Sequence, residues 1–125
     1  MTWHEVLHHL DACPKALAWV AELLTHKPST TFAEAWAACT RPHWTAWLAA
    51  KVGANVQPLK RALALHADVC EVCRDNGVAH TSTIAGLHDA LTGPCLWIET
   101  YAPRSLPAVD EVERLLLRVE RKTGL

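Results

Sequence analysis

The residues best suited to chemistry are one histidine and two cysteines, spaced four and three positions apart: His66, Cys70 and Cys73. Side chains three or four positions apart lie on one face of an α-helix. Imidazole and thiolate groups are the ligands that Zn²⁺ prefers, so this trio makes a zinc-binding helical module one hypothesis. A fourth ligand is available further along the chain, at His80, His88 or Cys95.

The competing interpretation of this trio is core packing, and it is the one we favour. Small thiols are among the most frequently buried side chains and allow helices to pack closely. Zinc sites usually take a Cys-x-x-Cys pair from a turn, where the two sulfurs converge, whereas this pair lies within a predicted helix. We therefore expect no cofactor, with zinc as the alternative.

A second chemical hypothesis is a thiol-dependent enzyme centred on Cys95, which lies in a predicted loop. A nearby base (His80 or His88) and an orienting group (Asn76 or Asp89) would complete a nucleophile of the cysteine–histidine kind. No family signature surrounds this cysteine, and the chain has no glycine-rich phosphate loop, nucleophile elbow or paired carboxylates. The sequence therefore favours a protein without enzymatic activity.

Tryptophan is the compositional outlier, with six residues against one phenylalanine and one tyrosine. Each tryptophan brings a large apolar ring and an N–H group that needs a partner. Most should fill gaps between alanine-rich helices, but tryptophan and arginine also dominate binding energy at protein interfaces. The predicted partner-binding residues lie around one helix start: Arg41, His43, Trp44 and Trp47.

Charge and composition limit the other function classes. The chain has 125 residues with 12 basic and 13 acidic side chains, which argues against a general nucleic-acid binder, although tryptophans also stack on single strands. Residues 28–67 are mildly basic and residues 68–99 are acidic, which is typical either of two solvated faces or of a charged partner surface. No apolar run approaches the ~18 residues of a membrane span. We see no secretory signal, so we expect a cytoplasmic protein with reduced thiols.

The elements that must position these residues are all helices. Capping boxes begin at Thr2 and Thr31, and prolines at 14, 42 and 58 suit the first turn of a helix. The predicted helices span about 3–11, 14–26, 32–39, 43–52, 58–76, 84–91 and 107–122. Residues 95–101 fit either a short extended segment or a helical turn. The pattern indicates an all-α, compact single-domain bundle of six or seven short helices, with residues 58–76 at its centre.

Three segments together resemble a known group of proteins: residues 12–19 (ACPKALAW), 35–48 (AWAAC, then WTAWL) and 70–74 (CEVCR). Their order resembles that of small uncharacterised helical proteins of high-GC bacteria and phages, some of which are similar to immunity proteins of polymorphic toxin systems. Residues 84–91 differ from that group by lacking its tryptophan. The resemblance implies packing and binding, and no catalytic residue carries over.

These observations lead to one prediction with two alternatives. We predict a small cytosolic, non-enzymatic protein-binding module, an inhibitor or immunity-type protein of bacterial or phage origin that docks on another protein and modulates it. The alternatives are the zinc module and the thiol enzyme. A homodimer is compatible with the sequence, whereas a membrane partner is not expected.

Overall fold

The chain is all-α, as predicted. The computed structural model describes residues 2–71, 87, 90–92, 97 and 100–122, and within these residues it contains helices and turns but no strand. Over the same residues no helix is both long and apolar enough to cross a membrane. The helices form two compact units, unit 1 (residues 1–39 and 108–125) and unit 2 (residues 40–107). The expectation of a single domain stays a prediction.

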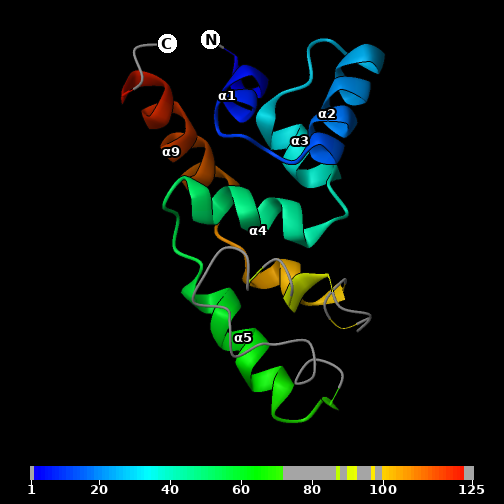
Figure 1. Cartoon of the computed structure of the whole chain (residues 1–125), viewed down its shortest axis with the longest axis vertical. Coiled ribbons are helices and arrows are strands. Elements are labelled where there is room, and N and C mark those ends of the chain that lie inside the picture. Colours follow the sequence, from blue (N-terminus) through cyan, green and yellow to red (C-terminus); the bar gives the residue numbers. More distant parts are fainter. Residues whose placement is uncertain (1, 72–86, 88–89, 93–96, 98–99, 123–125) are drawn as a thin grey trace. The chain divides into compact units, whose positions relative to one another are not determined.

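Unit 1 contains four helices: α1 (Trp3–His9), α2 (Pro14–His26), α3 (Phe32–Ala38) and α9 (Val109–Lys122) (Figure 1). Helix α1 packs against α2 and α9, and α3 also packs against α9. The buried apolar side chains of this unit come from all four helices and from the turn after α1: Val6, Leu7, Ala12, Val20, Phe32, Ala35, Val112 and Leu116. Their burial is what holds these short helices together, since isolated helices of this length are marginal in water.

Local signals set where the helices of unit 1 begin. The Thr2 hydroxyl accepts a hydrogen bond from the Glu5 amide, which caps α1. Thr31 and Glu34 form a complete capping box, in which each side chain bonds the backbone N–H of the other residue. Both starts agree with the sequence prediction, because capping depends only on residues three positions apart.

Unit 2 contains α4 (Pro42–Lys51), α5 (Gln57–Ala67) and the 3-10 helix η2 (Ala102–Ser105). Its core joins α4 and α5 to residues of the later segments: Ala46, Leu59, Leu63, Leu87, Ala90, Leu91 and Ala102. Leu87, Ala90 and Leu91 are helical, in agreement with the helix predicted over 84–91. Trp97 and Thr100 are helical, and the Tyr101 amide donates to the Trp97 carbonyl at 2.8 Å, so these described residues favour the helical turn over the extended segment.

Helix α4 ends as the sequence predicted, at a glycine. Gly53 has a φ of 86°, in the left-handed region that glycine tolerates best. The Gly53 amide donates to the Ala50 carbonyl, and the Ala54 amide donates to the Ala49 carbonyl at 2.9 Å. This pair of bonds is a Schellman motif, which satisfies carbonyls left without partners at the helix end.

The helix predicted over 58–76 begins where expected but is shorter, because α5 ends at Ala67. The Asp68 amide still bonds the Ala64 carbonyl at 3.3 Å, but the Val69 amide bonds the His66 carbonyl only three positions back. This tightening to a three-residue turn ends the α-helix. Asp68 and Val69 are in a turn, and Cys70 follows it.

Candidate partner-binding surface

The start of α4 positions the predicted partner-binding residues. Arg41 is the N-cap residue and has extended backbone angles, while Pro42 occupies the first helical position. Arg41 caps no backbone amide with its side chain, unlike Thr31 at the start of α3. A proline at this position needs no N–H partner and already has the helical φ, so it fixes the helix start.

Most of the buried residues of α4 lie on one face, although Leu48, four positions after Trp44 and three before Lys51, is buried as well. Thr45, Ala46 and Ala49 are buried, and the Thr45 hydroxyl donates to the Pro42 carbonyl at 3.1 Å. The spacing of 44, 47 and 51 places Trp44, Trp47 and Lys51 together on the other face. This division explains why two large rings of one helix remain partly at the surface.

Side chains at the start of α4 are in direct contact with one another. The Arg41 guanidinium lies over the Trp44 ring, with its central carbon 5.0 Å from the ring centroid. The His43 ring is 5.7 Å from the Trp44 ring, between centroids, at an interplanar angle of 58°. Arg41 is exposed, whereas the two tryptophans and His43 are half-buried. We call Arg41, His43, Trp44, Trp47 and Lys51 the α4 surface.

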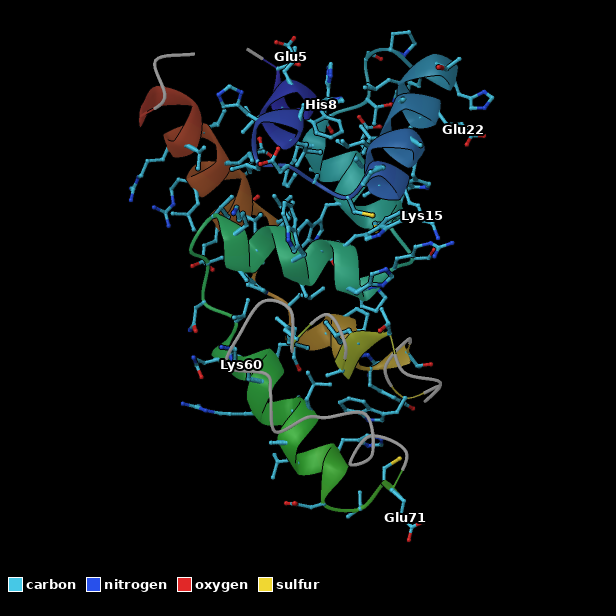
Figure 2. The ribbon with its side chains drawn as sticks, viewed as in Figure 1. Glu5, His8, Lys15, Glu22, Lys60 and Glu71 are labelled. Carbon is cyan, nitrogen blue, oxygen red and sulfur yellow. The ribbon has the colours of Figure 1, made fainter. Side chains whose placement is uncertain are left out.

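The charged side chains of the sequence segment that contains this surface have one sign. Residues 35–67 contain four basic side chains and no acidic one. Arg41, Lys51 and Arg61 are exposed, and Lys60, labelled in Figure 2 at the start of α5, is half-buried. The first acidic residue after Glu34 is Asp68, beyond the end of α5. The α4 surface therefore combines partly exposed indole rings with positive charge.

Of the predicted zinc ligands, the structure describes His66 and Cys70, and these two do not lie in one helix. His66 is in α5, but Cys70 lies beyond the end of that helix and packs against the core of unit 2. Cys73 lies outside the described residues, as do the candidate fourth ligands. Among the side chains that the structure describes, no group of three or more His, Cys, Asp or Glu residues is arranged to hold a metal ion.

The residues proposed for a thiol enzyme are outside the described part of the chain. These residues are Asn76, His80, His88, Asp89 and Cys95. The described cysteines, Cys13, Cys39 and Cys70, are not in disulfides.

The sequence did not predict a row of rings in unit 2. The His66 ring stacks on Trp97 with centroids 4.1 Å apart and planes 7° from parallel. Trp97 is 6.3 Å from Tyr101 between centroids, and the Arg104 guanidinium lies 5.0 Å from the Tyr101 ring. The contacts of Tyr101 with Trp97 and Arg104 could have been predicted, because residues three or four positions apart are neighbours on a helical turn. The His66 contact could not have been, because it depends on the packing of α5 against η2.

Comparisons of the chain with protein-family models, with curated proteins and with solved structures found no match.

Proposed function

We propose that the protein is a non-enzymatic binding module that docks on another protein through the α4 surface and modulates it. The observation that carries this proposal is the contact of the exposed Arg41 with the half-buried Trp44, one turn before the half-buried Trp47. Arginine and tryptophan are among the residue types enriched at the few interface positions that contribute most of the binding energy.

The contact between Arg41 and Trp44 favours binding because it orders the arginine side chain before a partner arrives. A guanidinium held over an indole ring loses less side-chain entropy when it binds. Because these two side chains are only three positions apart, the contact forms within one turn at the start of α4. Trp47 extends the apolar area along the same helix face.

An inhibitor or immunity-type role in the cytoplasm is the form of this function that we favour. Its support is the small size of the chain, the resemblance of residues 12–19, 35–48 and 70–74 to immunity-like proteins, and the absence of any catalytic motif from the sequence. An inhibitor needs a rigid contact surface and no chemistry of its own, and helical units satisfy this requirement.

The test is a pull-down from the native host at physiological salt, using the full chain and quantifying the stoichiometry of each captured protein. We expect one partner at a stoichiometric ratio. Arg41→Glu and Trp44→Ala should each weaken its capture at least about tenfold, as expected for interface residues of this kind.

Matched controls come from α2 in unit 1. Lys15→Glu makes the same charge change at an exposed position, and Trp19→Ala removes another half-buried indole ring. Both controls should retain the partner, and circular dichroism should show that all four variants keep their helices. If no stoichiometric partner is captured, or if the controls lose it as strongly as the α4 variants do, the proposed function is wrong.

A further inference from the structure

A pair of histidines belongs to unit 1, whereas the α4 surface belongs to unit 2. His4 and His8 are four positions apart within α1, so their side chains share one face of that helix. Together with Glu5 they give residues 4–8 the sequence His-Glu-x-x-His. On a helix, two imidazoles with this spacing can hold one divalent metal ion. The pair is therefore a candidate metal site.

The residues before His4 restrict where its ring can lie. Thr2 caps the first turn of α1. The indole N–H of Trp3 donates to the Thr30 carbonyl at 3.2 Å, which holds that ring in place. The His4 ring meets the Trp3 ring edge-on, with centroids 5.4 Å apart and planes at 88°. This contact orders the His4 ring, so less side-chain entropy is lost when a metal ion binds.

Both imidazoles remain available to a metal ion. His8, labelled on α1 in Figure 2, is exposed, and His4 is half-buried. In the part of the chain that the structure describes, neither ring takes part in a hydrogen bond or an ion pair. The buried residues of α1 are Val6 and Leu7, so the histidine pair stays at the surface. A neutral imidazole binds metal through a ring nitrogen that is not otherwise engaged.

We propose that His4 and His8 form a surface site for one divalent transition-metal ion, with both imidazoles as ligands. Imidazole suits Zn²⁺, Cu²⁺ and Ni²⁺, whereas Mg²⁺ and Ca²⁺ prefer carboxylate and carbonyl oxygens. Two protein ligands leave the other coordination positions of the ion to water. This site goes beyond the proposed binding function, and it uses none of the residues of the zinc alternative at positions 66–73.

Within the described residues, the site lacks the further groups of a metallopeptidase. In such enzymes the glutamate of this spacing acts as the general base, and a catalytic zinc ion normally has three protein ligands. Here the Glu5 carboxylate accepts a hydrogen bond from the Thr2 hydroxyl at 3.0 Å, which ties it to the helix cap. No third protein ligand joins the pair among the described residues. The site therefore binds an ion and does not use it for hydrolysis.

A zinc titration of the full chain without an affinity tag tests this site. NMR spectra of the histidine rings, assigned by substitution, follow the addition of ZnCl₂. We expect the ring signals of His4 and His8 to shift together and to saturate at one zinc ion per chain, whereas MgCl₂ should shift neither. His4→Gln and His8→Gln should each weaken zinc binding at the remaining histidine at least about tenfold, because one imidazole alone loses the gain from binding at two points.

Two control variants separate this site from the other histidines. His9→Gln also changes an exposed histidine of α1, but position 9 lies about 100° around the helix from His8, so this variant should keep the zinc affinity. His66→Gln changes the zinc alternative and should likewise leave the His4 and His8 shifts intact. Circular dichroism should show that all four variants keep their helices.

Three results would overturn the proposal. These are ring signals of His4 and His8 that do not both shift in excess zinc, a loss of affinity in His9→Gln as large as that in His8→Gln, and zinc-induced shifts that disappear in His66→Gln. None of these results depends on whether the pull-down captures a partner, so the metal site and the proposed binding function are tested separately.

Discussion

Two tryptophan clusters in this protein use similar residue types and differ in what surrounds the rings. In unit 1, Trp3 packs edge-on against the buried Phe32, with ring centroids 5.8 Å apart, and its indole N–H donates to the Thr30 carbonyl at 3.2 Å. In unit 2, Trp44 contacts the side chains of Arg41 and His43 at the start of its own helix. The first cluster joins distant segments, and the second is formed by one turn of α4.

The difference shows how packing separates structural from binding tryptophans. The unit 1 cluster is centred on Phe32, which is only 5% exposed, so its rings stabilise the fold. The α4 surface instead places a charged guanidinium against an indole ring at the surface, where a partner can use both. Predictions that separate stability from binding therefore test the comparison directly.

The largest expected effect is on the centre of the unit 1 cluster. Phe32→Ala should lower the free energy of unfolding by about 3–5 kcal/mol, because it leaves a cavity beneath two tryptophan rings. Trp44→Ala should lower it by less than half as much, since that ring is already partly in water. Urea denaturation followed by circular dichroism measures both losses. Equal losses would remove the distinction between the clusters.

The second largest effect is the loss of stability expected when Trp3 can no longer donate its indole hydrogen bond. Trp3→Phe should lower the free energy of unfolding by about 1–2 kcal/mol, because the Thr30 carbonyl loses its donor and some apolar area is lost. Trp36→Phe is the matched control, since Trp36 is also half-buried and packs on Phe32 at 5.9 Å between ring centroids. The comparison would fail if Trp36→Phe proved as destabilising as Trp3→Phe.

A smaller effect compares the two helix starts that precede these clusters. Thr31→Ala should destabilise the protein by about 1 kcal/mol, because it removes the capping box of α3. At the start of α4, Arg41→Asp should be about 1 kcal/mol more stable than Arg41→Ala, because both lose the contact with Trp44 but only aspartate can cap the helix. Thermal unfolding measures both differences. If Arg41→Asp were no more stable than Arg41→Ala, an aspartate at position 41 would not cap α4, and this prediction would be wrong.

The smallest effect depends on pH and concerns Glu34 in unit 1. Its hydrogen bond from the Lys27 ammonium, and then its bonds with Thr31, lower the pKa of the Glu34 carboxyl from its usual 4.5. The ionised form therefore stabilises the folded chain, fully above the usual pKa, and this contribution is lost as pH falls through the lowered value. Both side chains are exposed, so we expect a small change.

The measurement for this effect compares the unfolding of the natural chain with that of Glu34→Gln from about pH 6 to about pH 3. The stability difference between the two should be constant above the usual pKa and should shrink below it. Glu22→Gln on α2 is the control for the loss of one negative charge (Figure 2). A difference that does not change with pH would show that ionised Glu34 contributes nothing to α3.

Much of the helix pattern could be predicted because its causes are local. Thr31 with Glu34, Pro42 at the first position of α4, and Gly53 after its end each act over three to five residues. The Arg41–Trp44 contact has the same range, so these residues could be grouped from the sequence, while their binding of a partner stays a prediction. The addition of Lys51 to it needed only the helical spacing and the observed exposure.

Where a helix ends and which distant segments touch were decided by the tertiary structure. The helix around His66 ends at Ala67, so His66 and Cys70 do not share one helix face. His66 instead stacks on Trp97, and Trp3 donates to Thr30, contacts that join segments far apart in sequence. Amino-acid spacing determines contacts within a helical turn, whereas contacts between segments depend on where the chain turns back and which side chains fill the space between helices.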